Sequence, residues 1–295
     1  MANKNLSNAK KTKNDEFYTQ ISDIEKELKH YKHHFKDKVI YCNCDNPEWS
    51  NFYKYFKANF ESLGLKKLIT THYEINNPTY KMECFGGYGV EDVKTVLLQN
   101  GDFRSDECVE LLKEADVVVT NPPFSLFREY VALLEEYDKN YLIISNKNSI
   151  TCKDIFRLIK NNKLWLGYTS VREFKQPDNT FKKFGNVGWL TNLQIDKHNE
   201  KLLLNKKYSP NSYPKYDNYN AINVDKVKDI PCDYDGIMGV PITFLDKYNP
   251  EQFEIIGTSS LLANPIMINN KRCTGRFYID GHRLYDRILI KKRIK

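Results

Sequence analysis

Short apolar runs and amphipathic segments alternate along the first two thirds of the chain. Runs rich in Val, Ile, Leu and Tyr predict buried strands, and apolar residues at spacings of three and four predict helices with one buried face. The predicted strands are 38–44, 67–73, 117–120 and 141–145, and the predicted helices are about 22–34, 50–63, 106–114, 126–137 and 152–161. This alternation predicts an α/β fold with a doubly wound, mostly parallel sheet.

Two pairs of strand-like segments have no helix between them. Residues 80–85 and 93–98 predict a hairpin whose turn is the glycine cluster 86–89. A phosphate-binding loop is the alternative for this cluster, but the strand-glycine-helix setting of such loops is missing. Residues 164–169 and 187–193 predict an antiparallel hairpin at the edge of the sheet, joined by a charged stretch at 170–186.

The regular alternation is lost after about Asp196. Prolines, tyrosines and asparagines crowd residues 208–219, and three later segments look like short strands, at 242–245, 253–256 and 284–290. We therefore expect a flexible basic arm at 1–14, an α/β domain at 15–195 and a smaller, irregular α+β domain at 196–295.

Composition limits the class of protein. A chain of 295 residues that is 41% apolar can bury a substantial core. No apolar run approaches the ~18 residues of a membrane-spanning helix, and residues 1–14 lack the apolar segment of a signal peptide. Seven cysteines without regular spacing fit free thiols in a reducing compartment. We expect a cytoplasmic protein.

The net charge of +7 is concentrated near one end. Residues 271–295 contain nine basic and two acidic side chains, so this segment alone carries a charge of +7. A basic end on a neutral body predicts a polyanionic partner, and a solvated tail is the alternative. The candidate nucleic-acid contacts are Lys182, Lys183, Arg272, Arg276, Arg287, Lys291 and Lys292.

The clearest candidate chemistry follows the strand at 117–120. The sequence Asn121-Pro122-Pro123-Phe124 predicts a stiff turn, because proline fixes its own φ and restricts the residue before it. The Asn121 side chain and the Pro122 carbonyl can each accept a hydrogen bond from a planar amino group, and Phe124 can stack on the base that carries it. A proline-rich turn with a buried phenylalanine is the alternative.

The order of the motifs resembles the S-adenosylmethionine-dependent adenine-N6 DNA methyltransferases, and most closely the EcoRI-type modification methylases. The motifs that carry this resemblance are Phe17-Tyr18-Thr19, the segment 42–47, Gly101-Asp102-Phe103, Asn121-Pro122-Pro123-Phe124 and the segment 187–192, and it extends to the segment 284–290. The resemblance implies a Rossmann-like methyltransferase fold. Most methyltransferases carry Gly-x-Gly after the first strand, whereas this chain has Asn43-Cys44-Asp45-Asn46-Pro47, a departure that the EcoRI-type branch shares.

The resemblance also implies how S-adenosylmethionine is bound. Asp45 would face the ammonium group, Glu74 the ribose hydroxyls and Asp102 the adenine amino group. For each acid a helix N-cap is the alternative. The other implied cofactor residues are Phe17, Tyr18, Thr19, Asn43, Pro47 and Phe103. Trp189 is a candidate wall of the target-base pocket, with an ordinary core tryptophan as the alternative.

The motifs thus predict a site-specific methyltransferase that acts on a flipped-out adenine in double-stranded DNA. The resemblance implies that it acts as a monomer, in restriction–modification or genome marking, in a bacterium or phage. Methylation of RNA or of protein glutamine remains open, as does an inactive DNA-binding relative. Cys42 and Cys44, with His33 and His34, are the candidate ligands for a zinc ion. No metal is expected, because the chain has no second cysteine pair and this spacing gives poor ligand geometry.

Overall fold

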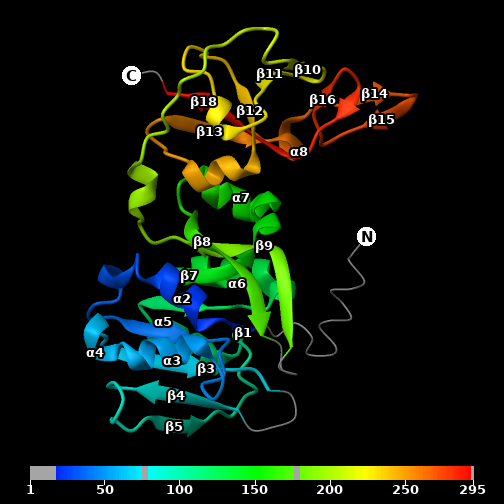
Figure 1. Ribbon diagram of the computed structural model, residues 1–295. Coiled ribbons are helices and arrows are strands. Elements are labelled where there is room, and N and C mark those ends of the chain that lie inside the picture. Colours follow the sequence, from blue (N-terminus) through cyan, green and yellow to red (C-terminus); the bar gives the residue numbers. More distant parts are fainter. Residues whose placement is uncertain (1–17, 75–78, 176–179, 294–295) are drawn as a thin grey trace. The chain divides into compact units, whose positions relative to one another are not determined.

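The structure is a computed structural model that describes residues 18–74, 79–175 and 180–293 (Figure 1). The described chain forms two compact units. The first contains the residues up to Phe156 together with Leu164–Gln194, and the second contains Arg157–Lys163 and the residues from Ile195 onward. The predicted basic arm, residues 1–14, and Phe17 lie outside the described residues.

A nine-stranded sheet forms the centre of the first unit. Its strand order is β1-β8-β9-β7-β6-β2-β3-β4-β5. The bounds are β1 (Tyr18–Thr19), β2 (Val39–Cys42), β3 (Lys67–Thr71), β4 (Tyr80–Cys84), β5 (Val93–Val96), β6 (Val117–Thr120), β7 (Asn140–Asn146), β8 (Trp165–Lys175) and β9 (Phe181–Thr191). The four central strands, β7, β6, β2 and β3, are parallel, and the strands on either side of them pair antiparallel. The predicted α/β class with a parallel centre is confirmed.

The charged stretch at 170–186 differs from its prediction. It was expected to be a connection between two short strands, but most of it extends the hairpin, so that β8 and β9 are each 11 residues long. The first part of β9 is largely exposed and the last part is buried. An apolar pattern therefore marked only the buried half of this strand.

The helices of the first unit begin close to where the pattern placed them, but the helix predicted at 22–34 ends at Leu28 and the helix predicted at 50–63 is divided at Asn59. Their bounds are α2 (Ile21–Leu28), α3 (Asn51–Ala58), α4 (Phe60–Leu63), α5 (Asp106–Glu114) and α6 (Phe127–Glu136), with 3-10 turns at η1 (Lys32–His34), η2 (Phe124–Leu126) and η3 (Lys147–Thr151). A further helix, α7 (Lys153–Lys160), begins in the first unit, and its residues from Arg157 onward belong to the second. Ser50 caps α3 by accepting hydrogen bonds from Phe52 N and Tyr53 N. Gly64 ends α4 with φ +62°, the left-handed conformation typical of a C-cap glycine.

A buried carboxylate joins α2 to the hairpin strand β8. Glu27 is fully buried and accepts hydrogen bonds from the backbone N–H groups of Tyr168 and Thr169, each at 2.7 Å, and from the Tyr31 hydroxyl at 2.8 Å. A Cβ on Gly167 would lie 2.3 Å from the Glu27 carboxylate, so only glycine allows this approach.

The four central parallel strands are mostly buried, as expected for strands covered on both faces.

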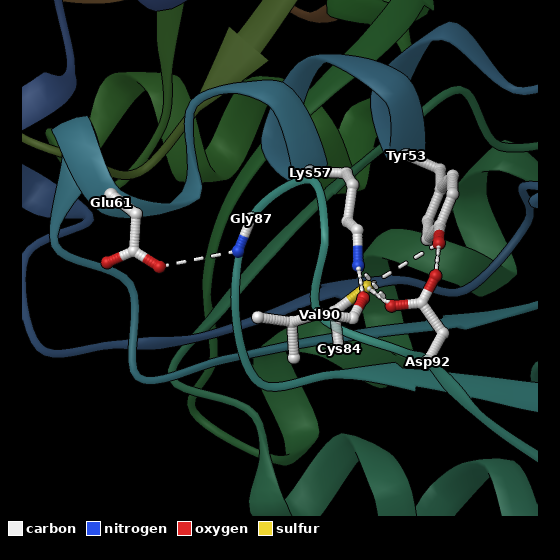
Figure 2. A network of polar contacts seen from close by, with 7 residues as sticks. All are labelled: Tyr53, Lys57, Glu61, Cys84, Gly87, Val90 and Asp92. Carbon is white, nitrogen blue, oxygen red and sulfur yellow. Dashed lines mark hydrogen bonds and ion pairs between the residues drawn. The ribbon is translucent and has the colours of Figure 1, made fainter.

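A polar network ties α3 to the hairpin of β4 and β5 (Figure 2). Lys57 Nζ lies 2.5 Å from Asp92 Oδ1 and 2.8 Å from the Val90 carbonyl. Asp92 also accepts hydrogen bonds from the Tyr53 hydroxyl and, at 2.8 Å, from Cys84 Sγ. The pairing of β4 with β5 confirms the predicted hairpin, and the glycines at 86–89 lie in its connection.

The second unit is built on a five-stranded sheet of order β10-β11-β12-β18-β13. Its elements are η4 (Asp196–Asn199), β10 (Lys215–Tyr216), β11 (Tyr219–Asn223), η5 (Val227–Asp229), β12 (Met238–Pro241), η6 (Ile242–Lys247), β13 (Phe253–Thr258), α8 (Ser259–Leu262) and β18 (Arg287–Lys292), with two-stranded ribbons β14 (Ile266–Ile268) with β15 (Lys271–Cys273) and β16 (Tyr278–Ile279) with β17 (His282–Arg283). The predicted strand at 242–245 is wrong. It is the 3-10 helix η6, which begins after Pro241 and buries Phe244 and Leu245.

Candidate active site

Asp45 lies buried beyond the end of β2, against the ends of two neighbouring strands. Its backbone N–H donates to the carbonyl of Thr71, the last residue of β3, at 3.0 Å. Its carboxylate accepts hydrogen bonds from the Ser50 hydroxyl at 2.8 Å and from the hydroxyl of Thr120, the last residue of β6. Through its backbone and its side chain, Asp45 therefore connects three adjacent strands at their carboxyl ends, where open α/β sheets bind ligands.

The hydrogen bonds of Asp45 leave one acceptor position of its carboxylate for a charged ligand. Burial raises the pKa of Asp45 to about 6, although hydrogen bonds from Thr120, Ser50 and the Asn121 backbone favour the charged form. A carboxylate offers about four acceptor positions, and these protein donors take three of them. An ammonium group could occupy the remaining position and would hold the carboxylate in its charged form.

Asn43 lies two residues before Asp45 and is also buried. Its side-chain oxygen accepts a hydrogen bond from the Tyr130 hydroxyl of α6. Its side-chain Nδ2 has no hydrogen-bond partner among the described residues. A buried donor without a partner is costly, so a ligand acceptor at this position would stabilise the site. Phe103 packs edge-on against Tyr130, with ring centroids 5.0 Å apart.

The loop that carries Asp102 lies against the segment that carries Glu74. The backbone N–H of Glu74 donates to the Asn100 carbonyl at 3.0 Å. Gly101 has φ +70°, and a Cβ there would lie 2.1 Å from the His72 carbonyl oxygen. Glycine at this position is thus required for the close approach of the two segments. The structure therefore brings together the segments of two acids that are 28 residues apart in the numbering.

Asp102 is paired with an arginine that the sequence did not single out. The carboxylate accepts hydrogen bonds from Arg104 Nε at 2.8 Å and from Arg104 Nη2 at 2.7 Å. Arg104 Nη1 lies 2.9 Å from Glu129 of α6. This two-pronged contact fixes the orientation of Asp102 at the sheet edge.

The Asn-Pro-Pro-Phe corner begins at the end of β6, next to Asp45. Asn121 and Pro123 are partly exposed, Pro122 is buried, and Phe124 begins the 3-10 turn η2. Phe124 is partly exposed and meets Phe174 of β8 and Phe184 of β9 edge-on, each with ring centroids 6.5 Å apart. The corner thus carries an amide and a ring on a turn that two prolines stiffen.

The motif Tyr18-Thr19 also reaches this region. Thr19 pairs with Phe174 in the ladder of β1 and β8, and its carbonyl accepts a hydrogen bond from Asn51 Nδ2 at 2.7 Å. The buried hydroxyl of Thr19 has no partner among the described residues. Thr19, Asn43 and Asp45 are therefore buried polar residues of the kind that a polar cofactor requires, and they fit the cofactor that the sequence predicts.

The protein-family model described as "Adenine-specific methyltransferase EcoRI" matches residues 5–293 of the chain. The chain belongs to this family of methyltransferases. The resemblance stated from the sequence motifs is therefore confirmed, and so are the enzyme class and the adenine-specific methylation that the family description names.

The family assignment agrees with named relatives. The chain is 47% identical to the Type II methyltransferase M.EcoRI of Escherichia coli, over 99% of this chain and 97% of the relative. It is 40% identical to the Type II methyltransferase M.MgeORF184P of Mycoplasma genitalium and 38% identical to M.MpnI of Mycoplasma pneumoniae, each over 98% of both chains. No solved structure matches the chain.

In this member of the EcoRI family Trp189 packs in the interior. Its side chain is 1% exposed and meets Phe52 of α3 edge-on, with ring centroids 5.9 Å apart. A Cβ on Gly167 would lie 2.5 Å from the Cβ of Trp189. This packing supports the alternative of a core tryptophan, and a role in the target-base pocket stays a prediction.

Several predicted nucleic-acid contacts have acidic neighbours within their own unit. Arg276 pairs with Asp286 at 2.7 Å, Arg287 lies 3.5 Å from Asp225, and Lys292 lies 3.4 Å from Asp235. Lys182, Lys183, Arg272 and Lys291 are exposed. Sequence charge alone did not separate these two groups.

The structure adds site residues that the sequence analysis missed. They are Ser50 and Thr120 around Asp45, Tyr130 on Asn43, Arg104 on Asp102, and Phe174 and Phe184 around Phe124. Of these, Ser50 could have been found from the sequence, since serine before an amphipathic segment is typical of an N-cap.

A hollow of about 230 Å³ lies beside the Asn-Pro-Pro-Phe corner, lined by Ser125, Leu126, Arg128, Glu129 and Ala132.

No helix of the described chain is long and apolar enough to cross a membrane. Within 18–74, 79–175 and 180–293 there is also no cluster of three or more histidine, cysteine, aspartate or glutamate residues that could hold a metal ion.

Proposed function

We propose that this protein transfers a methyl group from S-adenosylmethionine to N6 of an adenine that is flipped out of double-stranded DNA. The observation that carries the proposal is the Asn-Pro-Pro-Phe corner beside the buried Asp45, in a chain of the adenine-specific EcoRI family. The mixed α/β sheet of the first unit is compatible with a Rossmann-like methyltransferase fold.

The reaction requires acceptors for the amino group of the base. The side-chain oxygen of Asn121 and the carbonyl of Pro122 would each accept a hydrogen bond from one N–H group of the amino nitrogen. These two hydrogen bonds would draw the nitrogen lone pair out of conjugation with the ring. Phe124 would stack on the adenine and compensate part of the few kcal/mol that extrusion from the duplex costs. Pro123 would keep this turn in one conformation.

The bound cofactor supplies an electrophilic methyl group on a sulfonium. Asp45 would bind its ammonium group, and Glu74 and Asp102 would take the ribose hydroxyls and the adenine amino group. Tyr18, Thr19, Asn43, Pro47 and Phe103 would complete the walls of the site. The unpaired Nδ2 of Asn43 and hydroxyl of Thr19 support this assignment, because each is a buried polar group that a ligand could satisfy.

The second unit would bind the DNA. It carries most of the excess positive charge of the chain, and Lys291 and Arg272 present exposed cations that suit phosphate oxygens or base edges. Lys182 and Lys183 of the hairpin strand β9 would add contacts from the first unit. The named relatives are Type II methyltransferases, so the proposed role is modification of specific DNA sites by a monomer in the cytoplasm of a bacterium.

A methylation assay with radiolabelled S-adenosylmethionine tests this function. The purified protein is expected to label double-stranded DNA in adenine and to leave RNA and glutamine-containing peptides unlabelled. Sequencing of the treated DNA for N6-methyladenine would give the target site. Label in RNA or peptide instead of DNA, or binding of DNA without any label, would overturn the proposal.

A further inference from the structure

A two-stranded ribbon with a tight turn leaves the five-stranded sheet of the second unit (Figure 1). In it β14 pairs antiparallel with β15, so that Ile266 lies opposite Cys273, Met267 opposite Arg272, and Ile268 opposite Lys271. The two turn residues, Asn269 and Asn270, have φ +46° and +61°. Two left-handed residues in succession define the tight type I′ turn, in which asparagine is favoured.

One side chain fixes both ends of this ribbon. Asn218 is buried, and its Nδ2 donates to the Asn264 carbonyl at 2.7 Å and to the Arg276 carbonyl at 2.9 Å. Its Oδ1 accepts a hydrogen bond from Tyr278 N at 3.2 Å, and its carbonyl accepts one from Asn264 N at 3.2 Å. The ribbon is therefore held at its base as one element.

The two faces of the ribbon differ. Because side chains alternate along a strand, Met267 and Arg272 share one face, while Ile266, Ile268, Lys271 and Cys273 lie on the other. Met267 is 63% exposed and Arg272 is exposed, whereas Ile266, Ile268 and Cys273 on the second face are half-buried, with Lys271 exposed beside the turn. The exposed face and the tip thus present an apolar side chain, a guanidinium and two amides.

The exposed polar groups of the ribbon have no partners inside the described chain. The Asn269 and Asn270 side chains and the Arg272 guanidinium make no hydrogen bond or ion pair with any described residue. Residues 264–279 contain three basic side chains and no acidic one. The ribbon therefore offers donors to a partner outside the unit.

The neighbouring ribbon of β16 and β17 makes a contrast. It also turns through two left-handed residues, Asp280 and Gly281. The N–H groups of both turn residues donate to the carboxylate of Asp217, at 3.1 and 2.9 Å, and Tyr278 is buried. This second ribbon is docked along its turn on its own unit and presents less free surface.

We propose that the ribbon of β14 and β15 enters the major groove of the DNA and reads base edges there. This inference rests on the proposed function. The groove is about 12 Å wide and about 8.5 Å deep and admits a two-stranded ribbon. From Asn264 to Asn269 the strand spans roughly 17 Å at about 3.3 Å per residue, which is enough to reach the floor of the groove.

The chemistry of the exposed face matches what the groove displays. A guanidinium pairs with O6 and N7 of guanine, an asparagine amide with N6 and N7 of adenine, and an apolar side chain with the methyl group of thymine. Arg272 and the tip amides of Asn269 and Asn270 are accordingly the specificity-determining residues, with Met267 as the apolar contact.

The test compares two variants of the ribbon with one control variant in the same unit. Arg272→Ala and Asn270→Gly each remove a group proposed to read a base, and glycine at position 270 preserves the left-handed turn. Arg283→Ala is the matched control, because Arg283 belongs to the docked ribbon and lines a hollow of about 450 Å³ beside Arg276. Wild-type protein first defines the target site by sequencing of methylated adenines. Each variant is then assayed on that site and on every single-base variant of it, and thermal unfolding confirms folding.

For Arg272→Ala and Asn270→Gly the ratio of kcat/KM between the target and one particular single-base variant should fall by roughly 5- to 150-fold, the loss of one bidentate pair. Arg283→Ala should leave this ratio unchanged at every position of the site. Unchanged ratios at every position for both ribbon variants, in folded protein, would overturn the inference while leaving the proposed function intact. Failure of the wild-type protein to methylate any DNA would contradict the proposed function itself.

Discussion

The hydroxyl of Thr120 donates a hydrogen bond to the carboxylate of Asp45, across 75 positions of the chain. Thr120 is the last residue of β6 and immediately precedes Asn121. The residue proposed to hold the cofactor and the residue proposed to activate the target base are therefore joined through one buried contact. A change on either side of this contact should reach both binding and chemistry.

Thr120→Val should weaken binding of S-adenosylmethionine about tenfold or more. Valine keeps the shape of threonine but removes the donor, and a hydrogen bond to a charged group contributes about 1.5–3 kcal/mol. The pKa of Asp45 should rise further, so less of the ammonium-binding form is present near neutral pH. Isothermal titration calorimetry with the cofactor measures the change. Thr95→Val, on the exposed edge strand β5, is the control and should bind as the wild type does.

Asp45→Asn should change the pH dependence of stability in a defined direction. Burial raises the pKa of Asp45 from 3.8 to about 6 in the folded protein, so between these values the folded state holds more protons than the unfolded state. The contribution of Asp45 to the free energy of unfolding therefore falls as pH rises. From pH 4.5 to 7.5 this decline amounts to about 2 kcal/mol, and asparagine abolishes it.

Urea unfolding of both proteins without cofactor, at pH 4.5 and 7.5, measures this difference. The stability of Asp45→Asn relative to wild type should increase with pH, although cofactor binding is lost. Asp154→Asn, on the exposed start of α7, is the control for removal of a surface carboxylate. A difference in stability between Asp45→Asn and wild type that does not change with pH would mean that burial does not raise the pKa of Asp45.

Asn121→Ala should lower kcat by about 100-fold or more while leaving cofactor affinity unchanged and DNA affinity within roughly tenfold. Loss of one preorganised hydrogen-bonding group at a reacting centre typically costs 100- to 1,000-fold in kcat. Single-turnover methylation and equilibrium binding separate the two effects. Asn140→Ala at the exposed start of β7 is the matched control. Turnover close to wild type in Asn121→Ala would remove this residue from the mechanism.

The central strands could be predicted because strands that are buried on both faces consist of continuous apolar runs. Val117–Thr120 and Val39–Cys42 are buried at every position. The start of α5 at Asp106 could also be predicted from neighbouring residues, because Ser105 is a typical N-cap residue and caps this helix. The position of Asp45 followed from the end of β2, whereas the roles of Asp45, Glu74 and Asp102 came from the resemblance to the EcoRI-type methylases.

Contacts between distant segments left no such trace. Glu27 meets Tyr168 across 141 positions, and nothing near Glu27 distinguishes it from a solvated helix residue. Phe184 lies in the largely exposed first part of β9, and Phe174 is buried in a part of β8 that was expected to be a charged connection, so neither was recognised as a neighbour of Phe124. Arg104 was missed because its pairing with Asp102 and Glu129 depends on how the loop folds against α6.

The network of Figure 2 gives a prediction about stability that is independent of the active site. Lys57 and Asp92 form a mostly buried pair, with side chains 7% and 19% exposed. Burial acts to raise the pKa of Asp92, but hydrogen bonds from Cys84, Lys57 and Tyr53 outweigh it and hold the pKa below its ordinary value. Asp92 is therefore charged in the folded protein at neutral pH.

Lys57→Met should consequently reduce the free energy of unfolding by about 3–5 kcal/mol at pH 7, because it leaves a buried carboxylate without its cation. The loss should shrink as pH falls and Asp92 takes up a proton. Lys54→Met, one turn earlier on α3, is the control: Lys54 is exposed and donates only to the Trp49 carbonyl, so its replacement should cost less than about 0.5 kcal/mol. Urea unfolding at pH 5 and 7 distinguishes the two variants, and equal losses would show that the pair does not clamp the hairpin to α3.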